Sequence, residues 1–193
     1  PVCAARYARV VDRSSAGGAA RRPGTRCVAF RRAGNVGGTG TLAMADLAQL
    51  CRDLGFAGVR TYIASGNVLF RAAGTEREVK RALEAALARL VGKSVGVLVR
   101  TAAEIAAVSQ ANPFPDAPAA RTVVLFLDRP PPPGALDEAT GRRDETVALG
   151  RREVYVHYPA GIASSKLRIP AAAAATGRNM NTVAKLAALA AEL

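Results

Sequence analysis

The chain is poor in the residues that usually carry redox, metal and aromatic chemistry. Its 193 residues include no tryptophan, one histidine, two methionines and three cysteines, and aromatic residues make up 5% of the total. Cys3, Cys27 and Cys51 have neither CxxC spacing nor histidine partners, which argues against a zinc site. We therefore predict reduced thiols in a cytoplasmic protein, with no metal and no cofactor.

Long apolar runs are absent too. The longest, TVVLFL at residues 122–127, is far shorter than the roughly 18 residues that cross a membrane, so we expect no membrane partner. Residues 1–25 lack the apolar segment of a secretory signal. We interpret their arginine-rich, acid-poor composition as a basic flexible N-terminal extension, with an organelle transit peptide as the alternative.

Acidic residues are scarce mainly at one end of the chain. The formal net charge is +12, and residues 1–32 hold eight arginines against a single acid, Asp12, so seven of these charges lie there. From residue 33 onward, 19 basic residues stand against 14 acidic ones. Because a basic tail attracts nucleic acid by counterion release, we expect nucleic acid to be a partner mainly through this tail.

What is present is a regular alternation of helix and strand patterns. Half of the residues are hydrophobic, which is typical of a globular chain. The predicted elements of the first half are a strand at 26–30, a helix at 44–55, two strands within 59–70, a helix at 76–92 and a strand at 95–101. The two central strands flank Ser65, Gly66 and Asn67, which suit a hairpin turn. This βαββαβ order predicts a ferredoxin-like half at residues 26–101.

The second half, residues 102–193, repeats the cycle from a different starting point. Its predicted elements are a helix at 102–112, a strand at 121–128, a short helix at 134–141, strands at 145–150 and 152–158, and alanine-rich helical material ending in a C-terminal helix. The predicted fold class is α/β (α+β). It has two ferredoxin-like βαββαβ-type halves, the second readable as a permuted copy, and mixed antiparallel sheets with helices packed on them.

Three polar stretches between these elements could carry chemistry. In the glycine-rich loop AGNVGGTG, backbone N–H groups could approach a phosphate, although the loop has neither a P-loop lysine nor GxGxxG spacing. The SGN turn, taken alone, is a structural hairpin. In GIASSKL, Ser165 and Lys166 follow a glycine-containing turn and supply a hydroxyl and a cation.

The stretch TGRNMNTVAK crowds hydrogen-bond donors around the start of the last helix. A side-chain cap explains one of Asn179, Asn181 and Thr182, not all of them. Arg178 offers a planar fork suited to phosphate or carboxylate, and Lys185 adds positive charge near the positive end of the helix dipole. We predict an anion site here, with a solvated basic helix start as the alternative.

Catalytic residues are few. His157, the only histidine, lies in a strand pattern where exposure on a polar face competes with a role as general base. No carboxylate pair stands in a motif. A transferase or hydrolase would therefore depend on Lys166, Arg178 and Ser65 to stabilise negative charge. A nucleic-acid binding module is a further alternative, and the strand aromatics that could stack on bases or lie in the core are Tyr62, Phe70, Tyr155 and Tyr158.

Four stretches in order carry a family resemblance: AFRRAGNVGGTGTLAMADL, LGFAGVRTYIASGNVLF, ANPFP, and the run from REVYVHYPAGIASSKL to TGRNMNTVAKLAALA. Over residues 26–193 the chain resembles the bacterial domain of unknown function (DUF) 1697 family. Relatives usually have an apolar residue in place of Arg31, and many have tryptophan in place of Met180. The resemblance implies two ferredoxin-like halves but no activity.

The resemblance also implies that the polar positions of these motifs belong together. They are Arg32, Asn35, Gly37, Gly38, Ser65, Gly66, Asn67, Ser165, Lys166, Arg178, Asn179, Asn181, Thr182 and Lys185. We therefore expect an uncharacterised cytosolic bacterial protein that binds an anionic ligand, phosphorylated or nucleotide-like, in a pocket between its two halves.

Overall fold

The computed structural model describes residues 24–32, 42–63 and 66–193. The first half consists of β1 (Thr25–Arg31), α1 (Met44–Asp53), β2 (Ala57–Tyr62), β3 (Asn67–Ala72), α2 (Glu76–Val91) and β4 (Val97–Thr101). Its strands form the first sheet in the order β2-β3-β1-β4, and every neighbouring pair is antiparallel. The βαββαβ order predicted for this half is confirmed.

The second half forms another four-stranded antiparallel sheet. Its elements are α3 (Ala102–Gln110), η2 (Ala119–Arg121), β5 (Thr122–Phe126), β6 (Thr146–Leu149), β7 (Glu153–His157), η3 (Ile162–Ser164), η4 (Pro170–Ala172), β8 (Thr176–Asn179) and α4 (Met180–Ala191), where η marks a 3-10 helix. The second sheet has the order β6-β7-β5-β8, which matches that of the first sheet strand for strand. The halves differ in helix placement, because α3 precedes the first strand of the second sheet and α4 follows its last.

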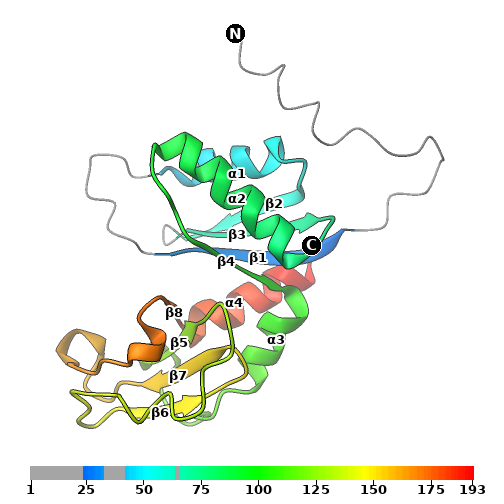
Figure 1. The fold of residues 1–193 in the computed structure, drawn as a ribbon. Helices are drawn as coiled ribbons and strands as arrows, with labels where there is room; N and C mark the ends of the chain where they lie inside the picture. Colours follow the sequence, from blue (N-terminus) through cyan, green and yellow to red (C-terminus); the bar gives the residue numbers. More distant parts are fainter. Residues whose placement is uncertain (1–23, 33–41, 64–65) are drawn as a thin grey trace.

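The two sheets are separated by a layer of two helices (Figure 1). The apolar cluster on the outer face of the first sheet contains residues of α1 and α2. A second cluster fills the space between the sheets and contains Leu186 of α4 and Ile105 of α3. In the same cluster, the rings of Phe30 of β1 and Phe126 of β5 stack directly on each other, with their centres 4.6 Å apart. The far face of the second sheet packs against connecting segments. Because α3 and α4 contribute to one core shared by both sheets, the halves are joined by hydrophobic burial.

Local chemistry accounts for where the helices begin and end. Thr75 and Glu78 form a capping box at the start of α2, and Thr101 and Glu104 do the same for α3. Gly92 ends α2 in the left-handed conformation that glycine adopts without steric cost. The helices predicted at 44–55, 76–92 and 102–112 are all present.

The structure corrects the sequence interpretation at three places. Residues 133–138 form successive turns, where we expected a short helix. Part of the alanine-rich material before the C-terminal helix is strand β8, which pairs with β5. The apolar spacing of the helix predicted at 76–92 places Leu90 on its apolar face, but Leu90 is exposed, because Val91 instead continues the four-residue row set by Leu83 and Leu87.

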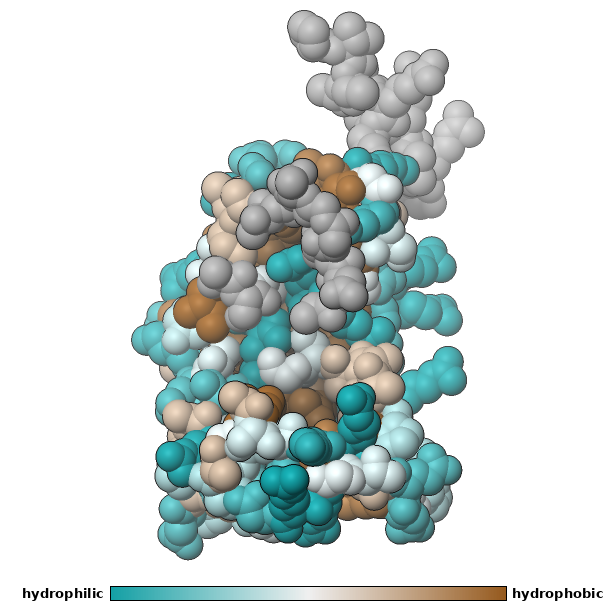
Figure 2. Space-filling view, turned by 90° about the vertical axis from the view of Figure 1, so that its left-hand side faces the viewer, coloured by the Kyte–Doolittle hydropathy of each residue, from teal (hydrophilic) through white to brown (hydrophobic). Residues whose placement is uncertain are grey.

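The described part of the chain contains no helix long and apolar enough to cross a membrane. Figure 2 shows a face of the molecule on which hydrophilic residues predominate and hydrophobic ones are scattered in small areas. Such scattered apolar residues are ordinary for a protein surface.

Candidate functional site at the junction of the two sheets

Four of the predicted site residues lie outside the described residues. They are Asn35, Gly37, Gly38 and Ser65. The other ten can be placed, and they fall into separate groups. The group at the junction of the two sheets is the richest in contacts.

Arg178 and Asn67 meet at this junction although 111 residues separate them in sequence. Arg178 lies in β8 of the second sheet, and Asn67 begins β3 of the first. The Arg178 Nε donates a hydrogen bond of 2.6 Å to the Asn67 Oδ1, and the Asn67 Nδ2 donates one of 3.0 Å to the backbone oxygen of Tyr62. The prediction placed the two residues in one site, and they are in direct contact.

The Arg178 guanidinium is held on several sides. Its Nη1 donates to the Thr176 hydroxyl at 2.9 Å and to the Gly177 carbonyl at 2.7 Å, and its carbon Cζ lies 5.4 Å from the centre of the Phe30 ring. Only 8% of the residue is exposed. These contacts fix the orientation of the guanidinium, and the aromatic face below it adds a cation–π attraction.

Arg31 is a second arginine at this junction. The Arg178 Nη2 donates to the backbone oxygen of Arg31 at 3.5 Å. Burial, followed by the positive charge of Arg31, lowers the pKa of Arg178 to about 10. Desolvation and a nearby like charge both disfavour the charged form. The junction therefore holds two positive charges at an electrostatic cost.

The hairpin end beside these arginines has an unusual backbone. Ile63 has a φ of 52°, a conformation that is rare for a β-branched residue, and its side chain is 47% exposed. Gly66 has a φ of 82°, and a Cβ placed there would lie 2.9 Å from the Arg31 Cβ. Only glycine fits this position without strain, because the Arg31 side chain fills the space beside it.

The polar residues at the start of α4 have different roles: one caps the helix, one is buried and two are exposed. The Asn179 Oδ1 accepts a hydrogen bond of 3.0 Å from the Thr182 backbone N–H, so Asn179 is the N-cap. Thr182 is buried, whereas Asn181 and Lys185 are exposed.

Ser165 and Lys166 belong to a different part of the second half. The Ser165 hydroxyl donates to Glu145, whose carboxylate also accepts from the Arg143 backbone N–H at 2.6 Å. Ser165 lines a cavity of about 240 Å³ together with these two residues and Tyr158. Among the described residues, Lys166 is exposed and forms no ion pair. Nothing in the sequence pattern pointed to Glu145 as the partner of Ser165.

Arg32 takes part in a contact between the halves. Its Nη2 pairs with Asp128, which follows β5, and the Asp128 Oδ1 also pairs with the Lys80 Nζ at 2.6 Å. Burial opposes the ionisation of Asp128, but the hydrogen bond from Lys80 and the charge of Arg32 outweigh it and lower its pKa. Sequence reasoning missed Asp128, because it follows a buried strand and belongs to no motif.

The remaining chemically reactive groups lie in the core or against it. Cys27 and Cys51 are free and buried, and burial raises the pKa of their thiols to about 11 and about 12. His157 lies half-buried near the ring of Phe114. No group of three or more metal-ligating side chains is found in the parts of the chain that the structure describes.

Two four-stranded antiparallel sheets of matching strand order, with helices between them, define a mixed α/β protein of two ferredoxin-like halves. The chain belongs to the family "Protein of unknown function (DUF1697)", whose sequence pattern matches residues 25–155. The resemblance seen in the sequence is thus confirmed. The matched range ends before the GIASSKL and TGRNMNTVAK motifs.

A solved structure supports the fold. The "conserved bacterial protein SP0830 from Streptococcus pneumoniae" is 22% identical in sequence, with a TM-score of 0.71. The similarity covers 86% of this chain and 98% of that protein. No curated protein matches this chain.

Proposed function

We propose that the protein binds an anionic ligand, phosphorylated or nucleotide-like, at the junction of its two sheets. The observation that carries the proposal is geometric: the buried Arg178 guanidinium, fixed by Asn67 and Thr176, donates to the backbone oxygen of Arg31 at 3.5 Å. Burial and, second, the charge of Arg31 lower the pKa of Arg178 to about 10. Strongly perturbed ionisable groups concentrate at functional sites. An anion bound near both guanidiniums would offset their mutual repulsion.

Each residue has a distinct part in this proposal. Arg178 is fixed by Asn67, Thr176 and the Phe30 ring, so it supplies a preorganised positive charge. Arg31 is half-buried and packs over Gly66, so it is the arginine better placed to reach a ligand from solvent. Arginine is suited to phosphate because its donors form a planar fork.

The strained hairpin end favours this location over the other predicted groups. Ile63 is held at a φ of 52° and lies four residues before Asn67 in the sequence. Backbone strain of about 1–3 kcal/mol per residue persists where the surrounding structure imposes it, and such residues gather at ligand clamps and active sites.

The two alternative functions have less support. For an enzyme that uses Lys166, Arg178 and Ser65, Lys166 is exposed, Arg178 is buried, and Ser65 lies outside the described residues. For a nucleic-acid binding module, helices cover both faces of the first sheet, and Phe70, Tyr155 and Tyr158 are buried. Bases therefore cannot stack on those three rings.

The test is a thermal-shift titration of the full chain with inorganic pyrophosphate, ATP and a short RNA. A ligand at a hundredfold excess over its dissociation constant stabilises a protein by about 2.7 kcal/mol. We expect pyrophosphate or ATP to raise the melting temperature of the wild type and of Arg71→Gln, and to do so much less in Arg31→Gln. Arg71 is the matched control because it is an exposed arginine of β3 with the same charge.

The outcome that would contradict the proposal is equal stabilisation of both variants, or none in either while the proteins stay folded. Stabilisation by RNA alone, retained in Arg31→Gln, would favour the nucleic-acid alternative.

A further inference from the structure

A cavity of about 240 Å³ lies in the second half, between the loop that precedes β6 and the segment that follows β7. Residues 143–145 form one side of it. The other side is formed by Tyr158, Ala160, Gly161, Ser164 and Ser165. Sites for drug-sized ligands occupy roughly 300–1,000 Å³, so this cavity suits a smaller molecule. It shares no residue with the group around Arg31 and Arg178.

Tyr158, the residue that follows β7, brings a buried hydroxyl to this cavity. Only 7% of the residue is exposed, and its hydroxyl forms no hydrogen bond with any residue that the structure describes. Tyr155, which is buried in the same strand, instead donates to the Val108 carbonyl at 3.0 Å. Buried polar groups are almost always hydrogen-bonded. The partner of the Tyr158 hydroxyl must therefore come from within the cavity.

Glu145 places a negative charge at the same cavity. It is 3% exposed, and its two carboxylate oxygens accept from the Ser165 hydroxyl and, at 2.6 Å, from the Arg143 backbone N–H. The hydrogen bond from Ser165, followed by that from Arg143, lowers the pKa of Glu145 and keeps it ionised. Burial, followed by the charge of Glu145, raises the pKa of Tyr158, so the phenol keeps its proton. An anionic ligand would be repelled by this carboxylate.

The rim of the cavity carries both signs of charge. Arg143 and Asp144 are exposed, and neither forms an ion pair with a described residue. The Arg142 Nε donates to the backbone oxygen of Glu145 at 2.9 Å, so a second guanidinium lies close by. A cationic ligand would be repelled by these arginines, as an anionic one would be by Glu145. The charges therefore favour a neutral ligand.

We infer that this cavity binds a neutral, polyhydroxylated molecule of about the size of one sugar ring. The side chains that line it offer donors and acceptors together: the Tyr158 hydroxyl, the Arg143 guanidinium and the Asp144 carboxylate. The Ser164 hydroxyl donates to the backbone oxygen of Gly161 at 3.0 Å, so its own oxygen remains an acceptor. A ligand hydroxyl both donates and accepts, so a polyol satisfies both kinds of group without adding a charge.

The experiment titrates the full chain with two matched sets of sugars and follows binding by saturation-transfer difference NMR. One set is D-glucose, D-glucosamine and D-glucuronate, and the other is D-galactose, D-galactosamine and D-galacturonate. Within each set the ring is the same and the charge differs. We expect at least one neutral sugar to bind at least fivefold more tightly than both of its charged relatives. No binding of either neutral sugar, or equal or tighter binding of the charged relatives in both sets, would overturn the inference.

Paired variants locate the binding. Tyr158→Phe removes only the unpaired hydroxyl and should weaken sugar binding at least threefold, whereas Tyr62→Phe, which removes a hydroxyl from β2, should not. Ala160→Leu fills the cavity without altering its charges and should weaken binding at least tenfold. Ala173→Leu is its control, because Ala173 is exposed outside the lining. Unaltered affinity in both Tyr158→Phe and Ala160→Leu would place the sugar elsewhere and overturn the inference.

Arg31→Gln separates this cavity from the junction site. We expect Arg31→Gln to leave sugar binding unchanged, while Ala160→Leu leaves stabilisation by pyrophosphate unchanged. Loss of sugar binding in Arg31→Gln would assign the sugar to the junction and overturn the inference.

Discussion

At the scale of single residues, the hydrogen bond between Asn67 and Arg178 stands out because both partners are buried. Asn67 is 0% exposed and links the hairpin of the first sheet to β8 of the second. Asn67→Ala would remove the acceptor for the Arg178 Nε and the donor to the Tyr62 carbonyl. Leaving buried polar groups unpaired costs about 1–3 kcal/mol each.

We therefore expect Asn67→Ala to lower the free energy of unfolding by at least about 2 kcal/mol, measured by urea denaturation. Asn181→Ala is the control, because Asn181 is exposed at the start of α4, and its effect should stay within about 0.5 kcal/mol. A small loss in Asn67→Ala, similar to that of the control, would mean that the contact contributes little to stability.

Gly66 allows a second residue-scale prediction. A Cβ there would meet the Arg31 side chain at 2.9 Å, whereas Gly55, with a similar φ of 80°, has nothing within 4 Å. Both alanine variants carry the cost of a left-handed residue, about 1–2 kcal/mol. Gly66→Ala should cost more in a urea titration, because Arg31 must also move. Equal losses of unfolding free energy in the two variants would show that the Arg31 side chain moves aside at no cost.

At the scale of elements, Asn179 at the start of α4 has a structural role as a helix cap. The Asn179 side chain caps the helix through the Thr182 N–H. We expect Asn179→Ala to destabilise the protein by about 1 kcal/mol in thermal unfolding, as loss of a helix cap usually does. Asn179→Ser, which keeps a capping oxygen, should recover most of this loss. A destabilised serine variant would argue against capping.

The same segment shows what the sequence could and could not predict. Polar residues at 178–182 stood out, but β8 did not, because TGRN contains glycine and asparagine and lacks the alternation of a half-buried strand. Its strand conformation depends on pairing with β5, a tertiary contact. Helices with capping boxes and regular apolar spacing, such as α2, could be predicted because their signals are local.

The candidate site residues show the same limit: the residues could be named from the sequence, but their tertiary contacts could not. Arg178 and Asn67 were predicted as members of one site, yet their hydrogen bond spans 111 residues and could not be derived from spacing. Ser165 and Lys166 were assigned to that site as well, and Ser165 instead pairs with Glu145. Polar residues from different sequence motifs need not lie together in space, because the topology of the chain decides which ends of strands meet.

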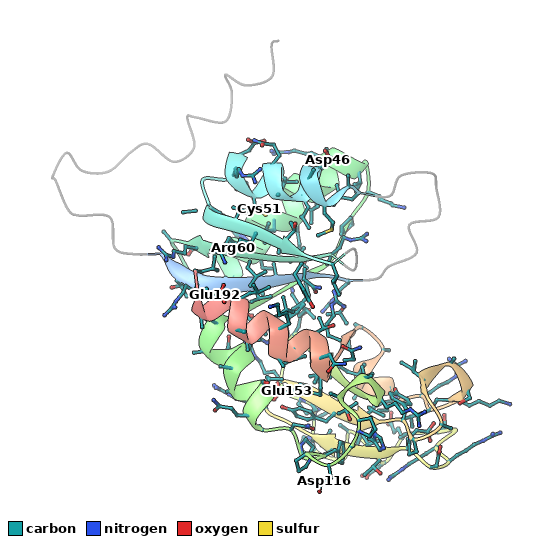
Figure 3. All side chains as sticks on the ribbon, turned by 180° about the vertical axis from the view of Figure 1, so that it is seen from behind. Asp46, Cys51, Arg60, Asp116, Glu153 and Glu192 are labelled. Atoms are coloured by element: carbon teal, nitrogen blue, oxygen red, sulfur yellow. The ribbon has the colours of Figure 1, made fainter. Side chains whose placement is uncertain are left out.

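At the scale of the whole molecule, ion pairs complement the shared apolar core in joining the halves. Arg152 links the start of α2 to α3, and Asp128 links β5 to Arg32 and Lys80. At the far end, Arg60 of β2 pairs with Glu192 beyond α4 at 3.2 Å, and both residues are labelled in Figure 3. The exposed and isolated Arg60–Glu192 pair adds little to stability. Arg152 and Asp128 each pair with two partners, and such networks of several charges contribute more than an isolated pair.

The network around Asp128 predicts that the free energy of unfolding decreases at acid pH. The pKa of Asp128 is lowered from its ordinary value of 3.8, so its ionised form stabilises the folded state above that pH. This stability is lost as the pH falls through the lower folded-state pKa. We expect Asp128→Asn to reduce the free energy of unfolding at pH 7 and to flatten its decrease below about pH 4. An unchanged pH profile would contradict the role of Asp128.

The central claim is that an anion binds where the two sheets meet. The most direct measurement is the change in backbone amide chemical shifts, by two-dimensional NMR, as inorganic pyrophosphate is added to the full chain. We predict that the largest changes fall on Gly66, Asn67 and residues 176–179, and that Arg31→Gln reduces them. Changes confined to the exposed arginines Arg77 and Arg81 of α2, or the absence of any change, would contradict the account.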